Sequence, residues 1–327
     1  MRAGQSFYAH GKLLLSGEYV VLDGAKALAL PTKFGQHLSV RYEKSYAPHL
    51  HWKGIDVEGK VWFEAAFELW KFDLMDSYRE TPENLYLQKL LRAVREENSH
   101  FLREEETTVK VTTRLEFPLE WGLGSSSTLI YNMAQWAYIS PFELQFKTMG
   151  GSGHDIACAH ASAPILYEKN REGPLWEPIS FRPPFSHKLY FVYLGNKQKT
   201  REGIDYYRGL HFAPKEKAEL TLKISAITKE IPKARDLTDF EFLLKGHEVL
   251  LSESLKMKRV QELRFPDYWG VVKSLGSWGG DFVLVTSERG EEETRRYFLD
   301  KGCPLFFRYD EMIGVSSETG SGGEPIH

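Results

Sequence analysis

The chain has 327 residues, of which 42% are hydrophobic, 27% charged and 13% aromatic, so its composition is that of a folded soluble protein rather than a disordered or fibrous one. Its length suggests about two domains. The formal net charge of -3 provides no basic surplus for nucleic acid or an anionic membrane. No apolar run is long enough to span a bilayer, and Gly17 and Glu18 interrupt the N-terminal one. We therefore expect a cytoplasmic protein with neither kind of partner.

The two cysteines, Cys158 and Cys303, lie far apart in the sequence and match no metal-binding or redox spacing. This usage favours a reducing compartment, although it leaves one disulfide possible. Two buried thiols are the simpler interpretation.

The first third of the chain predicts strands followed by a helix. Residues 11–32 alternate short apolar runs around Asp23 and Gly24, a pattern typical of a β-hairpin. Residues 36–45 and 59–69 have the alternation of further strands. Residues 82–102 place leucines at helical spacing opposite charged residues, which predicts an amphipathic helix.

Two glycine-rich segments follow, each placed before a helix. Residues 107–117 alternate as a half-exposed strand does, and the sequence "WGLGSSS" then leads into a helix with an apolar face. The second segment, "GGSGHD" at 150–155, precedes a helix of small residues and a strand. Proline content rises and periodicity is lost near 178–186, where we place a domain boundary.

The second half predicts a strand at 188–195, three helices between 201 and 255, two strands between 270 and 288, and a final helix and strand. The strands alternate in polarity and lack the continuous apolar runs of a buried parallel sheet. These features favour an α+β fold over a doubly wound one.

The run from Gly122 to Ser127 can be interpreted in two ways from its residues. Glycines allow close backbone approach, and helix N-terminal amides attract anions, so the run could bind phosphate. It could equally be an ordinary turn with several possible helix caps. The Walker pattern is absent, and the third glycine of a dinucleotide fingerprint is missing.

Four segments in order resemble the motifs of the GHMP kinases. Residues 118–127, "PLEWGLGSSS", resemble the family's phosphate loop. Residues 11–18, "GKLLLSGE", resemble its opening motif and are most similar to the mevalonate and phosphomevalonate kinase branch. "GGSGHD" resembles the segment that holds its catalytic aspartate, and "KSLGSWGGD" at 273–281 resembles its C-terminal glycine-rich motif in altered form.

This resemblance implies two domains with the active site between them. Residues 1–180 would form a ribosomal-protein-S5-like domain, and residues 181–327 a ferredoxin-like one. It also implies an enzyme that uses ATP and Mg²⁺ to phosphorylate a small molecule. A homodimer is expected by analogy alone.

The resemblance also implies roles for particular residues. Asp155 matches the catalytic aspartate and Lys12 the lysine beside it, whereas a helix cap and a solvated strand end are their alternative roles. The backbone that would hold the ATP phosphates comprises Gly122, Leu123, Gly124, Ser125, Ser126 and Ser127. Ser126 matches the serine that ligates Mg²⁺. The residues expected near the acceptor are Glu18, Tyr19, His154 and Thr200.

Several positions depart from the family pattern. Tyr19 stands where mevalonate kinases usually have histidine and is more like phosphomevalonate kinases. The acidic Mg²⁺ ligand has no aligned counterpart, and Glu143, one residue out of register, is a candidate. Trp278 and Asp281 replace glycines of the C-terminal motif, where bulk and negative charge oppose close phosphate approach.

Mevalonate and phosphomevalonate are the expected acceptors, as in isoprenoid precursor synthesis. Another GHMP sugar or alcohol kinase, or a diphosphomevalonate decarboxylase-like enzyme, fits the same motifs. A nucleotide- or metabolite-binding regulatory module is the non-enzymatic alternative, which the altered C-terminal motif favours and the retention of Lys12, Ser126 and Asp155 opposes.

Overall fold

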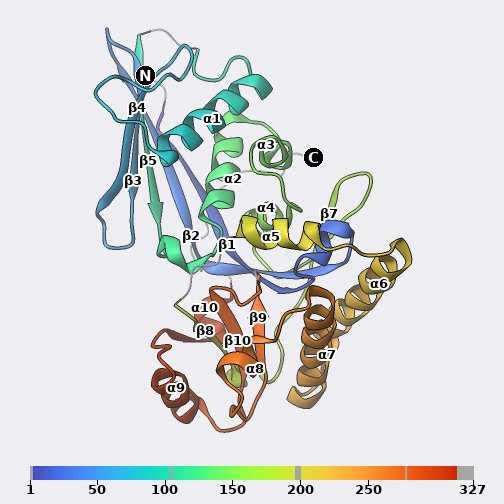
Figure 1. The fold of residues 1–327 in the computed structure, drawn as a ribbon. Helices are drawn as coiled ribbons and strands as arrows, with labels where there is room; N and C mark the ends of the chain where they lie inside the picture. The colour runs from blue at the N-terminus through green and yellow to red at the C-terminus, as the bar shows by residue number, and fades with distance from the viewer. Residues whose placement is uncertain (1–2, 104–105, 196–199, 277, 315–327) are drawn as a thin grey trace.

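The computed structural model describes residues 3–103, 106–195, 200–276 and 278–314, and it contains two β-sheets with helices packed against them. Figure 1 shows one sheet in the upper half of the molecule and the other in the lower half. The expected α+β class is confirmed. Within the described ranges, no helix is both long and apolar enough to cross a membrane.

The first sheet has seven strands in the order β4-β3-β5-β2-β6-β7, with β1 paired to β2. The β3–β5 pair is parallel, and the other pairs are antiparallel. The strand predictions near the N-terminus are confirmed, and β3 is an additional strand. The strands are β1 (Gln5–Ser16), β2 (Ala27–Lys44), β3 (His49–Ile55), β4 (Val61–Glu68), β5 (Thr107–Leu115), β6 (Ile165–Lys169) and β7 (Pro174–Pro178).

The predicted hairpin exists as the antiparallel β1–β2 pair. Its connection is longer than a two-residue turn, because a 3₁₀ helix, η1 (Val20–Asp23), lies between the strands. Gly24 ends this helix with a φ of 90°, a left-handed conformation that glycine adopts without strain. The pairing register shifts between His10 and Lys12, so the strand is irregular immediately before Lys12.

Four helices cover one face of the first sheet (Figure 1). The longest, α1, is preceded by the cap residue Thr81, whose side chain accepts a hydrogen bond from the Asn84 N–H in a capping box. The predicted helix over 82–102 is confirmed, although it ends at Glu97. The four are α1 (Pro82–Glu97), α2 (Ser125–Ala137), α3 (Pro141–Thr148) and α4 (His154–His160).

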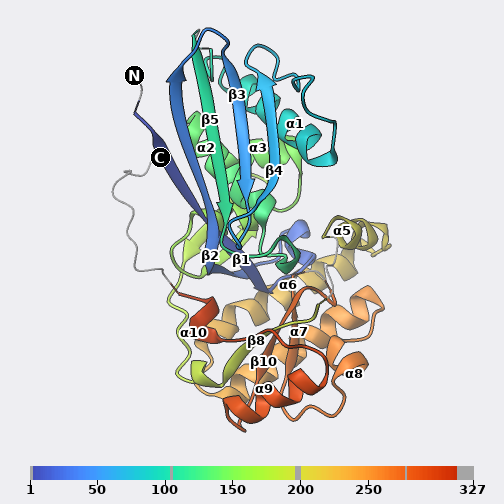
Figure 2. The ribbon, with the colours of Figure 1, turned by 90° about the vertical axis from the view of Figure 1, so that its left-hand side faces the viewer.

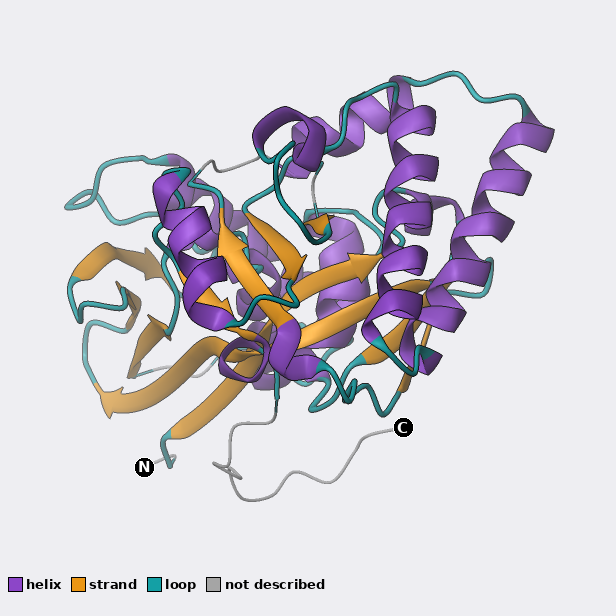
Figure 3. Cartoon of the chain, turned by 90° about the horizontal axis from the view of Figure 1, so that it is seen from below, coloured by secondary structure: helices purple, strands orange, loops and turns teal. Residues whose placement is uncertain are grey.

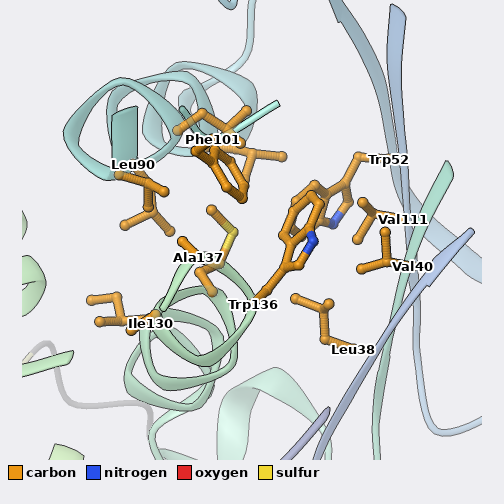
Figure 4. Close-up of a cluster of buried hydrophobic side chains, with 14 of the residues drawn as sticks. Leu38, Val40, Trp52, Leu90, Phe101, Val111, Ile130, Trp136 and Ala137 are labelled. Atoms are coloured by element: carbon orange, nitrogen blue, oxygen red, sulfur yellow. The ribbon is translucent and has the colours of Figure 1, made fainter. Parts of the chain in front are cut away.

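Large apolar side chains fill the space between these helices and the sheet (Figure 4). Trp136 of α2 packs near Trp52 of β3, and Phe101 meets the Trp136 ring edge to face. The Trp136 ring nitrogen donates to the Tyr42 hydroxyl at 2.9 Å, so its one polar atom is paired despite burial. This core holds α2, and with it the glycine- and serine-rich loop, in a fixed position on the sheet.

The second sheet is antiparallel, with strand order β11-β8-β10-β9. Its strands are β8 (Leu189–Tyr193), β9 (Val272–Leu275), β10 (Phe282–Thr286) and β11 (Phe306–Arg308). The helices of this half are α5 (Thr200–Gly209), α6 (Pro214–Glu230), α7 (Leu237–Leu255), α8 (Val260–Arg264), α9 (Glu291–Asp300) and α10 (Tyr309–Met312). Two long helices, α6 and α7, lie side by side, and α7 packs against β9 of this sheet (Figure 3).

One apolar core joins the two sheets. Leu13 and Leu30 of the first sheet pack in the same cluster as Phe191, Phe240 and Leu284 of the second half. The chain also returns at its end to the first sheet, where α10 lies beside β2, as Figure 2 shows. The lower end of β1 and β2 is therefore fixed against the second sheet, and the candidate site lies near this junction.

Candidate active site

The glycine- and serine-rich loop is built as a helix N-terminus. A short 3₁₀ helix, η2 (Leu119–Trp121), is followed by Gly122 and Gly124, with φ angles of 66° and 91°. Both angles lie in the left-handed region that favours glycine. Gly124 caps α2 and has no side chain that could accept a hydrogen bond from the first amides of the helix. Those amides and the helix dipole can therefore bind an anion.

Lys12 lies directly beside this loop. Its backbone N–H donates to the Leu123 carbonyl at 2.9 Å, which ties β1 to the loop. Its side chain runs along Gly124, because a Cβ built on that glycine would lie 3.3 Å from Lys12 Cγ. Any larger residue at Gly124 would be strained by its φ and crowded by Lys12. The lysine thus places a positive charge at the start of α2.

Asp155 lies in the first turn of α4 and is bound by two other helices. The Ser127 hydroxyl of α2 donates to Asp155 Oδ2 at 2.5 Å. The Gln145 side-chain amide of α3 donates to Oδ1 at 3.2 Å. The structure therefore brings together the loop, Lys12 and Asp155, as the sequence resemblance implies, and adds Gln145.

These surroundings hold the pKa of Asp155 below its usual value. Burial alone raises this pKa. Four effects together outweigh burial and lower the pKa: the charge of His154, the Ser127 hydrogen bond, the Lys12 charge and the Gln145 hydrogen bond. Burial lowers the pKa of His154 to about 4, with a further lowering by Lys12 that the Asp155 charge opposes. Because His154 is then neutral at pH 7, Ser127, Lys12 and Gln145 keep Asp155 ionised there.

His154 is held by its own loop. Its Nδ1 shares a hydrogen bond of 2.7 Å with the Ser152 hydroxyl, and its Nε2 is buried without a partner. His154 therefore adjoins Asp155 in the sequence and in space, with one ring nitrogen unused. Its assignment as an acceptor contact stays a prediction.

Tyr86 of α1 is a site residue that the sequence analysis missed. Its hydroxyl is buried, and burial and the Asp155 charge raise its pKa, whereas the Ser126 hydroxyl lowers it. Tyr86 therefore lies close to both Ser126 and Asp155. In the sequence it is one apolar residue of an amphipathic helix, so no local signal distinguishes it.

Glu143 does not reach Asp155. It lies exposed in the first turn of α3, where its N–H donates to the Ser140 hydroxyl. Two residues later, the buried side chain of Gln145 points to the aspartate instead. Positions two apart lie on different faces of a helix, so Glu143 and Gln145 point in different directions, and Glu143 as a metal ligand stays a prediction.

Glu18 is enclosed at the junction of the two halves. It is 1% exposed, and its carboxylate forms an ion pair with Lys273 of the C-terminal motif. Lys273 also lies 3.1 Å from Glu248 of α7, and His247 lies 3.3 Å from Glu18. Burial raises the pKa of Glu18 to about 7, against the lowering effect of the Lys273 charge. Glu18 thus links the first and last motifs, which argues against a direct acceptor contact.

Tyr19 also joins the first motif to the last. Its hydroxyl accepts a hydrogen bond of 2.7 Å from the Trp278 N–H, and its ring stacks on Tyr207 of α5. Trp278 is buried in an apolar cluster, so its indole fills space at this contact. Thr200 is the first residue of α5, and its side chain lies outside what the structure describes.

Asp281 lies against the phosphate loop. A side chain added at Gly122 would collide with the Asp281 carboxylate, so the two residues are in close contact. Tyr193 is nearby, because burial and then the Asp281 charge raise its pKa. The expected negative charge of the altered motif therefore lies at the loop.

The oxygens at this site suit a Mg²⁺ that arrives with a nucleotide. Among the described residues, no group of three or more histidine, cysteine or acidic side chains could hold a metal by itself. Mg²⁺ commonly uses one or two protein oxygens, with phosphate and water completing the shell. The Ser126 hydroxyl and the Asp155 carboxylate both lie near Tyr86 and offer oxygens of the kind that Mg²⁺ prefers, and Ser126 as its ligand stays a prediction.

Comparison with solved structures identifies the fold. Methanococcus jannaschii mevalonate kinase aligns with a TM-score of 0.66 at 16% identity, over 93% of this chain and 97% of that one. Streptococcus pneumoniae phosphomevalonate kinase in complex with phosphomevalonate and AMPPNP aligns with a TM-score of 0.68 at 15% identity, over 93% and 99%. The chain has the fold of the GHMP kinases.

That fold is shared with enzymes of different acceptors. Lactococcus lactis galactokinase, complexed with galactose, aligns with a TM-score of 0.66 at 12% identity, over 96% of this chain and 94% of that one. No protein-family model matches the sequence, and no curated protein matches it at a significant level. Because enzymes with different acceptors share the GHMP kinase fold, the acceptor of this protein must be inferred from the residues of its site.

Proposed function

We propose that this protein is an ATP-dependent small-molecule kinase that transfers the γ-phosphoryl group to a hydroxyl or phosphate of a mevalonate-type acceptor. One observation carries the proposal: Lys12, Ser127 and Asp155 come from separate motifs and meet at the N-terminus of α2. Phosphoryl transfer depends on positioning and charge neutralisation, and this arrangement supplies both.

Each group has a role in that reaction. The amides from Gly122 to Ser127 bind phosphate oxygens, and Lys12 neutralises part of their charge. Ionised Asp155 accepts the proton of an acceptor hydroxyl as its oxygen bonds to the γ-phosphorus and the bond to ADP breaks. A phosphate acceptor is already ionised and needs no general base, and the Lys12 charge would then attract it. Mg²⁺, bound through Ser126 and the nucleotide phosphates, would neutralise developing charge.

The same proposal covers the domain arrangement and the setting. We divide the chain into 1–180 and 181–327, because the two sheets separate between β7 and β8. The β11-β8-β10-β9 order, with helices after β8 and β10, supports a ferredoxin-like second domain. The proposal also includes a ribosomal-protein-S5-like first domain. It places the enzyme in the cytoplasm, where it would form a homodimer.

A nucleotide-binding module without turnover is the second candidate function. The contact of Asp281 with Gly122 favours the absence of turnover, because a carboxylate at the loop opposes the placement of the γ-phosphate for transfer. A diphosphomevalonate decarboxylase-like reaction would use the same Asp155 region and would additionally release CO₂.

A coupled ADP-release assay separates these alternatives. Wild type and Asp155→Asn are compared with Mg²⁺-ATP and mevalonate, phosphomevalonate, diphosphomevalonate, homoserine and a sugar panel. Acceptor-dependent ADP release that the substitution abolishes supports the kinase, with CO₂ measured in parallel. Near-normal turnover of Asp155→Asn removes the aspartate from the mechanism. ATP binding without turnover on any acceptor favours the module.

A further inference from the structure

A cationic cavity lies beside the loop that leads to Asp155. Its volume is about 180 Å³, and its walls come from η1, the 150–153 loop, β6 and the α5–α6 region. Three basic side chains line it, Lys169, Arg208 and Lys217, together with a single acidic one, Asp23. Gly151 and Tyr207 are also part of the wall.

The acid in this cavity is already paired. Asp23 lies 2.6 Å from the Lys217 ammonium and accepts a hydrogen bond from the Tyr207 hydroxyl, also at 2.6 Å. These contacts balance the charge of Lys217. The positive charges of Lys169 and Arg208 are left without an acidic partner in the lining.

Lys169 and Arg208 are close enough to repel each other. Burial and then the Arg208 charge lower the pKa of Lys169. The Lys169 ammonium is held in place by the Gly151 carbonyl at 3.3 Å and lies 4.2 Å from the centre of the Phe146 ring. Arg208 is exposed, and two like charges that line one cavity favour the binding of an anion between them.

The cavity is adjacent to the reacting carboxylate. A Cβ built on Gly151 would lie 3.4 Å from the Gln145 amide nitrogen, and that amide binds Asp155. The Gln145 side chain therefore connects Gly151 of the cavity wall to the proposed catalytic group. Tyr207 of the same wall stacks on Tyr19, an expected acceptor contact.

We propose that this cavity binds a phosphate group carried by the acceptor. A phosphate monoester has a charge of roughly -1.5 to -2 at pH 7, which matches the two uncompensated cations, whereas a carboxylate would leave one of them unbalanced. Arg208 can donate two parallel hydrogen bonds to phosphate oxygens. The inference rests on the proposed function, and within it selects a phosphorylated acceptor whose hydroxyl, and not the phosphate bound in the cavity, receives the γ-phosphoryl group.

Calorimetric titration of the full chain with phosphomevalonate and with mevalonate tests this site without turnover. We expect phosphomevalonate to bind at least about tenfold more tightly, and Arg208→Gln and Lys169→Gln each to weaken it about tenfold without changing mevalonate binding. Arg171→Gln, an exposed arginine outside the lining, is the matched control. Equal affinity for both acceptors, or phosphomevalonate binding unaffected by Arg208→Gln, overturns the proposal.

A second titration is needed if neither phosphomevalonate nor mevalonate binds. Inorganic phosphate is then titrated and followed by ³¹P line broadening. Phosphate binding that Arg208→Gln weakens and Arg171→Gln does not would keep the cavity as a phosphate site and reject mevalonate-type acceptors. Absence of phosphate binding overturns the site itself. The ADP-release panel reports independently whether the protein is a kinase.

Discussion

The carboxylate of Asp281 lies against Gly122, the first glycine of the phosphate loop, although 159 positions separate the two residues in the sequence. The contact follows from the packing of the second sheet beneath the loop, since Asp281 immediately precedes β10. A negative charge is thereby placed at a site whose amides are arranged for an anion. This contact makes nucleotide affinity sensitive to one side chain of the C-terminal motif.

Asp281→Asn should tighten ATP binding by about tenfold. A unit charge a few ångström from a phosphate is repelled by about 1 kcal/mol in bulk water and about 4 kcal/mol near a protein surface, and the amide removes that repulsion. Calorimetry with a non-hydrolysable ATP analogue measures the change. Asp300→Asn, an exposed acid on α9, serves as control. Unchanged affinity in Asp281→Asn would show that Asp281 does not act on the bound phosphates.

Ser127→Ala should lower kcat by about ten- to a hundredfold, since a hydrogen bond to a charged group contributes about 1.5–3 kcal/mol. The substitution removes the 2.5 Å donor to Asp155 and leaves the loop backbone in place. KM for ATP should change much less. Ser125→Ala in the same loop is the matched control, and an equal loss of kcat in both variants would contradict a specific role of Ser127.

Gln145→Glu should create a cation site beside Asp155 that does not depend on nucleotide. It places a second carboxylate beside Asp155, and paired carboxylates bind divalent metals more tightly as ligand charge increases. We expect Mn²⁺ affinity without nucleotide to rise about tenfold or more, measured by electron paramagnetic resonance. Gln135→Glu, on the exposed side of α2, should leave Mn²⁺ affinity unchanged. No gain in Gln145→Glu would mean that the two side chains do not converge in solution.

His154 should make the protein less stable as the pH falls from 6.5 towards 4. Its folded pKa of about 4 lies below its ordinary 6.5, so in this window the unfolded state binds a proton that the native state does not. The stability of wild type relative to His154→Gln should therefore decrease through this range and be constant above it. Urea unfolding at several pH values measures the difference, with the exposed His100→Gln as control. A relative stability independent of pH would contradict the lowered pKa.

Much of the local structure could be predicted from the sequence. The helix that begins at Pro82, the strand before Pro118 and the helix after Gly124 follow from periodicity, caps and breakers, which act over a few residues. The strand β3 was missed although Leu50 and Trp52 alternate with polar residues, because the segment is short and its third buried position is a glycine, Gly54.

The sequence by itself determined which motifs the chain carries and that Lys12, Ser127 and Asp155 belong to them. Only the tertiary structure decided which side chains meet, because helix and sheet packing brings together residues distant in the chain. In α3 it is Gln145 whose side chain binds Asp155. Tyr86 of α1 lies near the same aspartate, and Glu18 is buried in an ion pair with Lys273. A local pattern specifies the face on which a residue lies, whereas its partners depend on how whole elements pack.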